Sequence, residues 1–341
     1  MKERIALIFG GKSSEHEVSL MSSASVLRAI DKEKFDVVLI GITREGEFRK
    51  VECTPEQIED KSWVSMSEPF DMWKIKEIAD FALPIVHGPN CEDGKLQGLL
   101  ELLDIPYGGC GVTASAVAMD KIMAKTIFRN AGIPVVKDVC VFKGDNVDEK
   151  ILEIEEKLSY PAFVKPANMG SSVGITKAHN RDELVKAISF AFEYDKRVLV
   201  EQFINAREIE TGILGNAEPK AASCGEILPN DAEFYDYRSK YTAGGAGLII
   251  PAEIPEEKYE EIRRLAVKAY RAIDGEGFSR CDFFLDRDNG NIYINEINTI
   301  PGFTKYSMFP MLWEDAGVSY RDNIEEIIRL GHERYNAKNN G

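Results

Sequence analysis

The sequence predicts a mixed protein, α/β in its first third and α+β in the rest, divided into three domains. Its 341 residues exceed the roughly 250 at which a single hydrophobic core stops growing, and 44% are hydrophobic, enough to fill several cores. Strand-like and helix-like stretches alternate in the first third, whereas strand-like stretches and a hairpin dominate the last third. We place the domains at residues 1–118, 119–206 and 207–341.

Net charge and the apolar pattern narrow the class of protein. Lys and Arg number 42 against 57 Asp and Glu, a formal charge of −15, which disfavours non-specific binding to nucleic acid or anionic lipid. No apolar run reaches the roughly 20 residues of a membrane helix, and two glycines interrupt the apolar stretch near the start, so we expect neither a membrane anchor nor a signal peptide. The protein is therefore expected in the cytoplasm, with its six scattered cysteines reduced.

In the first domain, predicted strands lead into glycine-bearing turns. The stretches that alternate are strand Ile5–Phe9, helix Val18–Ile30, strand Phe35–Ile42, strand Phe81–Val86 and helix Leu96–Leu103. Ligands of open α/β sheets bind at the carboxyl ends of strands. Function in this domain is therefore expected in the turns at Gly10-Gly11 and Gly88.

The second domain begins with a helix at Met119–Gly132 that carries two lysines and ends at Gly132 and Pro134. The second domain continues with strands Val135–Phe142, Ala162–Lys165 and Val198–Phe203 and helices Val147–Leu158 and Arg181–Glu193. The third contains helix Glu256–Ile273, two strands ending at Asn298, and an amphipathic helix at Tyr320–Tyr335. A long polar, glycine-containing segment at about 230–247 is predicted to be a lid.

Three oxygen-bearing side chains predict a metal site. Glu296 and Asn298 are two residues apart on one predicted strand, so they share a sheet face, and the hairpin turn at 288–291 can bring Asp282 beside them. Such hard ligands suit Mg²⁺ shared with substrate phosphates. The alternative is an exposed strand face followed by an Asx turn before Pro301, which Arg280 and the turn at Pro301 disfavour.

A second group of residues predicts phosphate binding. Lys165 ends a predicted strand and leads into the small-residue loop Gly170–Gly174, where backbone N–H groups can approach phosphate oxygens. The loop is not a Walker A motif, because no G-K-[ST] follows. Lys121 adds a second positive charge. The segment Glu201–Ile204, at the end of the next strand, can contact an adenine and its ribose.

Taken together, these motifs resemble the ATP-grasp ligases, and more narrowly the D-alanine–D-alanine ligases, over nearly the whole chain. The matching segments are Gly10-Gly11, Ser14–Leu20, His87-Gly88, Glu92–Gly94, Leu96–Gly98, Met119–Lys121, Lys165-Pro166, Gly170–Ser172, Tyr235–Tyr237, Lys240-Tyr241, Asn295–Thr299 and Pro301–Phe303. The resemblance implies that ATP phosphorylates the carboxylate of one D-alanine and that the amine of a second attacks the acyl phosphate. It also implies a homodimer that acts in peptidoglycan precursor synthesis.

The resemblance implies that the nucleotide lies between the second and third domains. Residues implied to bind it are Lys121 and Lys165 at the phosphates, Lys240 at the transferred phosphate, Glu201 and Glu208 at the ribose side, and Phe203 and Ile204 near the adenine. Gln202 stands where the family often has lysine, so adenine recognition is expected to rely more on backbone groups.

The resemblance also implies roles around the reacting atoms. Two Mg²⁺ ions, for which Mn²⁺ is a substitute, are held by Asp282, Glu296 and Asn298, while Arg280 and the N–H of Gly302 stabilise the tetrahedral oxyanion. Glu15 binds the ammonium of the first D-alanine, and Ser171 and Tyr241 hydrogen-bond with it. His87 orients substrate, Ser307 binds the second carboxylate, and Met308 gives an apolar wall that favours D-alanine over D-serine. Without the resemblance, Glu15 is equally well a helix N-terminal charge.

Three other functions are weighed. An NAD-dependent oxidoreductase is disfavoured, because the turn after the first strand lacks G-x-G-x-x-G. A non-catalytic nucleotide-binding module needs no metal ligands, yet Asp282, Glu296 and Asn298 are all present. A D-alanine–D-serine or D-alanine–D-lactate ligase of the same family remains the alternative for the second substrate.

Overall fold

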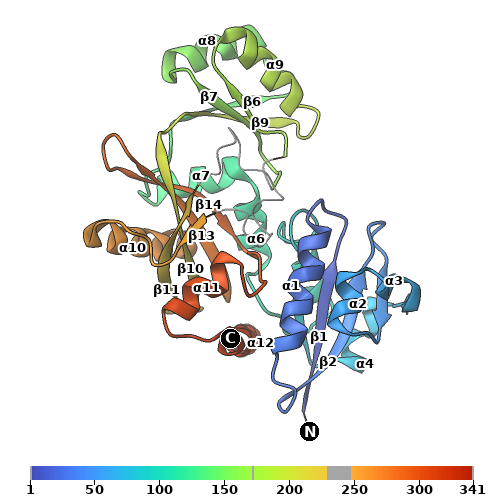
Figure 1. The fold of residues 1–341 in the computed structure, drawn as a ribbon. Helices are drawn as coiled ribbons and strands as arrows, with labels where there is room; N and C mark the ends of the chain where they lie inside the picture. Colours follow the sequence, from blue (N-terminus) through green and yellow to red (C-terminus); the bar gives the residue numbers. More distant parts are fainter. Residues whose placement is uncertain (1, 171–172, 229–246, 340–341) are drawn as a thin grey trace.

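The computed structural model describes residues 2–170, 173–228 and 247–339 and arranges them around three sheets. Figure 1 shows the N-terminal sheet on one side, the C-terminal sheet beside it, and the central sheet beyond the C-terminal one. The predicted mixed α/β and α+β class is confirmed. No helix within the described part of the chain is long and apolar enough to span a membrane.

The N-terminal sheet has the order β4-β3-β2-β1-β5, with β1, β2 and β5 parallel. Its strands are β1 (Glu3–Gly10), β2 (Phe35–Ile42), β3 (Phe48–Val51), β4 (Glu68–Pro69) and β5 (Phe81–Pro84). Its helical segments are α1 (His16–Ala29), α2 (Pro55–Glu59), α3 (Trp63–Met66), η1 (Met72–Lys74), α4 (Ile75–Ile78) and α5 (Lys95–Leu102). Because β1 and β5 are parallel neighbours, the turns after them meet at one edge.

The central sheet is antiparallel, in the order β6-β9-β7-β8. It consists of β6 (Asp138–Phe142), β7 (Ala162–Pro166), β8 (Thr176–Ala178) and β9 (Arg197–Gln202), with helices α8 (Val147–Lys157) and α9 (Arg181–Ala191). Valines of β6, β7 and β9 pack against isoleucines and leucines of both helices in a separate core. This unit therefore has its own hydrophobic interior.

The C-terminal sheet is antiparallel, in the order β12-β11-β10-β13-β14. Its elements are β10 (Ala206–Leu214), β11 (Lys220–Leu228), β12 (Gly247–Ile249), α10 (Glu256–Ala272), β13 (Phe278–Asp286), β14 (Ile292–Asn298) and α11 (Met308–Asp315). Helices α6 (Val112–Met119) and α7 (Lys121–Asn130) share a core with α10 and this sheet. Phe309 and Leu312 of α11 instead belong to the cluster that contains Ile5, Leu7 and Phe9 of β1.

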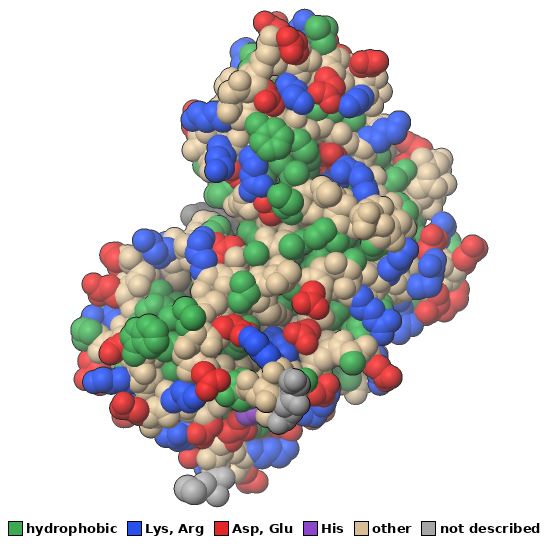
Figure 2. Space-filling view, turned by 180° about the vertical axis from the view of Figure 1, so that it is seen from behind, with side chains coloured by type: hydrophobic (Ala, Val, Ile, Leu, Met, Phe, Trp, Pro, Cys, Tyr) green, Lys and Arg blue, Asp and Glu red, His purple; other side chains and the backbone are tan. Residues whose placement is uncertain are grey.

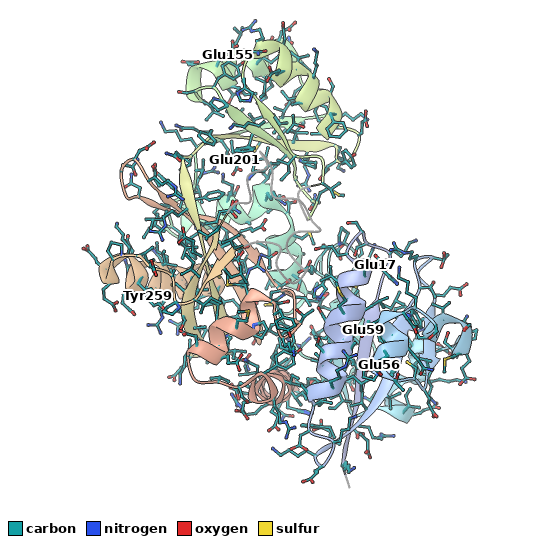
Figure 3. The ribbon with its side chains drawn as sticks, in the orientation of Figure 1. Glu17, Glu56, Glu59, Glu155, Glu201 and Tyr259 are labelled. Atoms are coloured by element: carbon teal, nitrogen blue, oxygen red, sulfur yellow. The ribbon has the colours of Figure 1, made fainter. Side chains whose placement is uncertain are left out.

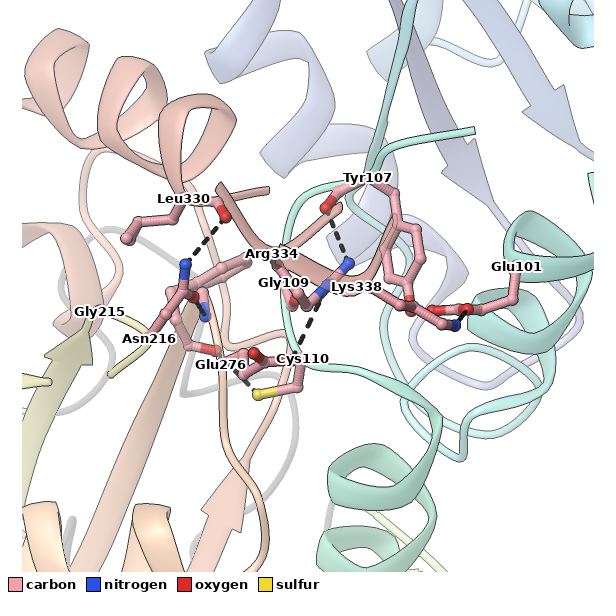
Figure 4. A network of polar contacts seen from close by, with 12 residues as sticks. Glu101, Tyr107, Gly109, Cys110, Gly215, Asn216, Glu276, Leu330, Arg334 and Lys338 are labelled. Atoms are coloured by element: carbon pink, nitrogen blue, oxygen red, sulfur yellow. Dashed lines mark hydrogen bonds and ion pairs between the residues drawn. The ribbon is translucent and has the colours of Figure 1, made fainter. Parts of the chain in front are cut away.

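Helix α12 (Tyr320–Asn339) joins the first and last parts of the chain. Ile324, Ile327 and Ile328 share one cluster with Phe81 of β5 and Phe278 of β13. Further along the helix, Arg334 donates to the carbonyl of Tyr107 at 3.0 Å and to that of Gly109, and its guanidinium lies 4.0 Å from the Tyr107 ring centroid (Figure 4).

Two predicted boundaries differ from the structure for identifiable reasons. Helix α7 begins at Lys121 because Asp120 caps it, accepting hydrogen bonds from the backbone N–H groups of Ile122 and Met123. Strand β6 begins at Asp138, since Val135 instead forms a bridge with Ile294 of β14. The chain therefore contacts the C-terminal sheet before it enters the central one.

Charges of both signs are mixed on the molecular surface. In the view from behind, Lys and Arg side chains alternate with Asp and Glu over the outer parts of the molecule (Figure 2). Such mixing differs from the one-sign stripe of a nucleic-acid-binding face. The six cysteines all lie in described segments and are free thiols.

Candidate active site

Four of the predicted site residues lie where loops from the three sheets meet: Glu15, Lys121, Glu296 and Asn298. A cavity of about 50 Å³ lies at this junction. Its walls are the residue before α1, the loop after β5, the α6–α7 turn, the loop after β7 and the end of β14. Its lining residues with polar or charged side chains are Glu15, Glu92, Lys121, Glu296, Asn298 and Thr299.

Glu15 is held between glycines from two loops. The residue is buried and directly precedes α1. A Cβ atom at Gly88 would lie 2.6 Å from Glu15 Oε2, and a Cβ atom at Gly170 would lie 3.2 Å from the same oxygen. Gly88 also has φ +79°, which disfavours a side chain. The absence of side chains at both positions therefore lets the carboxylate reach the glycine-rich turn.

His87 is a buried histidine that joins three segments. Its Nδ1 donates to the carbonyl of Ile300 at 2.8 Å, and its Nε2 accepts from Ser22 Oγ at 3.0 Å. Burial lowers the pKa of His87 to about 4, so the ring is neutral at physiological pH. Both ring nitrogens are bonded to protein and fix the loop that contains Gly302. Direct contact of His87 with substrate stays a prediction.

The hairpin of β13 and β14 brings the predicted metal ligands together. Asp282 pairs with Glu296 across the two strands, and Asn298 Nδ2 donates to Asp282 Oδ2 at 2.9 Å. Arg280 donates to both oxygens of Asp282, each at 2.7 Å, and forms an ion pair with Glu210 at 2.8 Å. Two carboxylates therefore fix the plane of the guanidinium.

The chemistry of this donor set fits Mg²⁺. Asp282, Glu296 and Asn298 offer carboxylate and amide oxygens, the ligands that this ion prefers. In the described segments, no group of three or more His, Cys, Asp or Glu side chains is arranged to hold a metal ion. A metal ion here would therefore need oxygens of Asn298 and of a bound phosphate in addition to the two carboxylates.

The predicted phosphate-binding lysines lie beside the glycine-rich turn. Lys121 Nζ donates to the carbonyl of Met169 at 2.5 Å, and Lys165 pairs with Glu201. Burial lowers the pKa of Lys121. Burial also acts to lower the pKa of Lys165, but the Glu201 carboxylate outweighs it and the pKa is raised. Glu201 lies on the side of the central sheet that faces the C-terminal sheet (Figure 3).

The residues predicted to contact adenine and ribose follow β9. Phe203 and Ile204 are half-buried, and the Phe203 ring centroid lies 6.1 Å from that of Phe163. Glu208 is exposed on β10. The chain passes here from the central sheet to the C-terminal sheet, so these side chains flank the boundary between the two.

The residues predicted to bind the second substrate lie before and at the start of α11. Ser307 Oγ accepts from the backbone N–H of Thr304 at 3.0 Å. Met308 is buried, and a Cβ atom at Gly225 would lie 2.7 Å from its Sδ. Gly302 is buried in the preceding loop. Three further predictions, Ser171, Lys240 and Tyr241, lie outside the described residues, as does the predicted lid apart from Gly247.

Glu92 is a half-buried residue of the cavity wall that was not predicted. Its carboxylate accepts from the backbone N–H of Gly88 at 2.6 Å and from that of Ile300 at 3.3 Å. Burial, and then the charge of Glu15, raise the pKa of Glu92 to about 8. Glu92 therefore connects the loop after β5 to the loop after β14. Glu92 lies in one of the segments that resemble the family, Glu92–Gly94, but that resemblance was not used to give it a role in the site.

Two more buried charges, Lys125 and Glu210, were not predicted, although sequence spacing points to both. Lys125 is one helical turn after Lys121, which places both on one face of α7. Glu210 is two residues after Glu208 on β10, so both point to one face of the sheet. Lys125 contacts Asp138 at 2.9 Å and also Glu201.

Comparison with known sequences gives a family. Residues 4–110 match the family described as D-ala D-ala ligase N-terminus, and residues 127–329 match D-ala D-ala ligase C-terminus. A D-alanine--D-alanine ligase of Thermoanaerobacter sp. (strain X514) is 48% identical, covering 99% of this chain and 98% of the relative. That of Acetivibrio thermocellus is 46% identical, covering 98% and 97%.

Solved structures agree with the sequence comparison. The VanG D-Ala:D-Ser ligase from Enterococcus faecalis has a TM-score of 0.89 and 39% identity, covering 97% of this chain and 100% of that one. The D-alanine-D-alanine ligase from Coxiella burnetii has a TM-score of 0.87 and 33% identity, covering 99% and 96%. The chain therefore belongs to the D-alanine–D-alanine ligase family and has the three-domain ATP-grasp fold of that family.

Proposed function

We propose that this enzyme joins two D-alanine molecules into D-alanyl-D-alanine. ATP transfers its γ-phosphoryl group to the carboxylate of the first D-alanine, which leaves ADP. The amine of the second D-alanine then attacks the acyl phosphate, forming the peptide bond and releasing phosphate. The observation that carries the proposal is that Glu15, Lys121 and Glu296 line the same cavity. We further propose a cytoplasmic homodimer that supplies peptidoglycan precursors, with domains at 1–118, 119–206 and 207–341.

The side chains around the cavity divide the work by charge. Glu15, buried at its edge, binds the ammonium of the first D-alanine. Lys121 and Lys165 neutralise the nucleotide phosphates. These local positive charges are needed because the protein as a whole, with a formal net charge of −15, repels an anionic nucleotide. Arg280, held by its carboxylate partners, and the N–H of Gly302 donate to the tetrahedral oxyanion.

The nucleotide lies between the central and C-terminal sheets in this proposal. Phe203 and Ile204 contact the adenine, while Glu201 and Glu208 face the ribose. Lys240 reaches the transferred phosphate, and Ser171 and Tyr241 hydrogen-bond with Glu15.

Asp282, Glu296 and Asn298 would hold two Mg²⁺ ions, with Mn²⁺ as a substitute. Bound there, the metal would offset the charge of the nucleotide phosphates. Asn298 already bonds Asp282, so the two ligands are fixed relative to each other before any ion arrives.

A D-alanine–D-serine ligase is the second candidate, because the VanG D-Ala:D-Ser ligase is a structural neighbour. In this proposal Ser307 binds the carboxylate of the second substrate, and the buried Met308 lies beside the side chain of that substrate. Methionine offers a serine hydroxyl no good hydrogen-bond partner. Burying that hydroxyl unpaired would cost about 1–3 kcal/mol, roughly 5- to 150-fold in preference. We therefore favour D-alanine at both positions.

The test is product identification in a competition. Purified protein receives ATP, Mg²⁺ and equimolar D-alanine, D-serine and D-lactate; phosphate release is followed, and products are identified by mass spectrometry. D-alanyl-D-alanine is expected as the major product. D-alanyl-D-serine or D-alanyl-D-lactate as the major product would change the assignment of the second substrate. Phosphate release no higher than in the control without amino acid would favour a non-catalytic nucleotide-binding module.

A further inference from the structure

Lys125 forms an ionic link between two parts of the fold. Its helix, α7, packs against the C-terminal sheet through Ala124 and Phe128, which belong to the core shared with α10. Its ammonium instead contacts Asp138 of β6 at 2.9 Å and Glu201 of β9, both in the central sheet. The Lys125 side chain is only 3% exposed. The contacts therefore lie in the interior and are poorly screened by solvent.

The two acids that Lys125 contacts are a like-charged pair. Asp138 and Glu201 lie directly opposite each other on neighbouring antiparallel strands, so their side chains share one face. Their side chains are 5% and 7% exposed. Two buried carboxylates in this position repel each other unless a cation lies between them. Lys125 occupies that position.

Glu201 divides its two oxygens between two lysines. Oε1 contacts Lys125 and Oε2 contacts Lys165. Burial acts to raise the pKa of Glu201, but these lysines hold it well below its ordinary value, so the group is a carboxylate. Lys165 is the lysine assigned above to the nucleotide phosphates. Because Lys125 neutralises part of the Glu201 charge, Glu201 attracts Lys165 less strongly. Lys165 can therefore bind a phosphate more readily.

We infer that Lys125 is a positioning residue of the nucleotide site, which fixes the Glu201 carboxylate and thereby leaves the charge of Lys165 for the phosphates. The inference rests on the proposed use of ATP and adds a residue that touches neither substrate nor nucleotide. A purely structural ion pair would instead stabilise the fold without changing nucleotide affinity.

The chain offers a matched control one turn further along α7. Arg129 also pairs with Asp138, but its side chain is 45% exposed. Replacing Arg129 by Met removes an ion pair to the same carboxylate while leaving Lys125 with Glu201. A change in ADP affinity that both Arg129→Met and Lys125→Met show comes from the lost contact with Asp138. A change that only Lys125→Met shows comes from the lost contact with Glu201.

The experiment measures Mg²⁺–ADP affinity by calorimetry without amino acid, together with KM for ATP and for D-alanine. For Lys125→Met we expect about tenfold weaker ADP binding and a similar rise in KM for ATP, with KM for D-alanine changed less than about twofold. Arg129→Met should bind ADP within about twofold of wild type. Circular dichroism and melting temperature check that each variant is folded.

Lys125→Met with wild-type ADP affinity would overturn the inference. If that variant does not fold, the double variant Lys125→Met/Asp138→Asn removes the repelling pair while leaving Glu201 to Lys165 alone. It too should bind ADP about tenfold more weakly, and wild-type affinity there would equally overturn the inference. Failure of the proposed function is separate: the wild-type protein would then bind Mg²⁺–ADP and form no dipeptide.

Discussion

At the residue scale, burial sets the charge of His87. In the folded protein its pKa is about 4, against an ordinary value of 6.5. Between these values the unfolded chain binds a proton that the folded chain does not. The stability that neutral His87 provides is therefore complete above pH 6.5 and is lost as the pH falls toward 4.

This sign gives a prediction. As the pH falls from 7 to 4, the wild-type protein should lose on the order of 3 kcal/mol more unfolding free energy than His87→Gln, whose side chain does not titrate. Urea denaturation at several pH values measures the difference. Parallel losses in both proteins would show that His87 is protonated in the native state.

A second residue-scale prediction concerns Glu296. Glu296→Gln should lower turnover by about a hundredfold or more, because a neutral amide cannot replace the carboxylate charge beside nucleotide phosphates and Mg²⁺. The fold should persist, since Glu296 is only half-buried. Phosphate release measures the effect, and Glu314→Gln, exposed on α11, is the control. Near-wild-type turnover would remove Glu296 from the metal site.

At the scale of elements, the sequence predicts most helices and strands because their signals are local. The hairpin of β13 and β14 follows from strand pattern and turn residues alone. Helix α6 was not predicted, since VTASAVAM has no amphipathic period, and its position depends on packing against α7 and β14. The start of β6 depends on a contact with β14, far along the chain.

Helix α12 carries a prediction at this scale. Arg334→Met should cost about 2–4 kcal/mol, because it leaves the buried carbonyls of Tyr107 and Gly109 without their donor (Figure 4). Arg329 on the same helix is 56% exposed and pairs with Glu326 and Glu333 of that helix, so Arg329→Met should change stability by less than about 0.5 kcal/mol. Chemical denaturation of both variants compares them. Equal losses would contradict the bridging role of Arg334.

At the scale of the whole molecule, the site depends on contacts that no local pattern contains. Motif order predicts Glu15, Lys121 and Glu296 as site residues, yet their meeting at one cavity depends on how three sheets pack. Glu92 was missed for the same reason, because its role follows from Ile300 in a distant segment. The position of Lys125 on α7 follows from its spacing to Lys121, but its contact with Glu201 does not. The roles given to the predicted residues remain predictions.

The hydrophobic cluster that α12 shares with the first sheet predicts that changes in α12 affect the stability of the whole protein. Ile327→Ala should fold but lose about 2–5 kcal/mol, since Ile327 is fully buried. Deleting residues 320–341 should prevent folding altogether, because Ile324, Ile327 and Ile328 would leave the first sheet partly uncovered. Size-exclusion chromatography and calorimetry measure both. A monodisperse truncated protein with a cooperative transition would show that the first sheet is stable without α12.

The packing of α12 against the first sheet also affects how the chain folds during its synthesis on the ribosome. Strand β1 emerges long before α12, and the ion pair Lys34–Glu325 joins residues 291 positions apart. The face of the first sheet that includes Phe81 is therefore covered only after the residues of α12 have been synthesised. Long-range closure of this kind is slow and leaves nascent apolar surface open to chaperones. Ser307, proposed to bind the second substrate, is also synthesised long after β1, so catalytic capacity and the completed first domain should appear together, only after residues 320–339 have been synthesised.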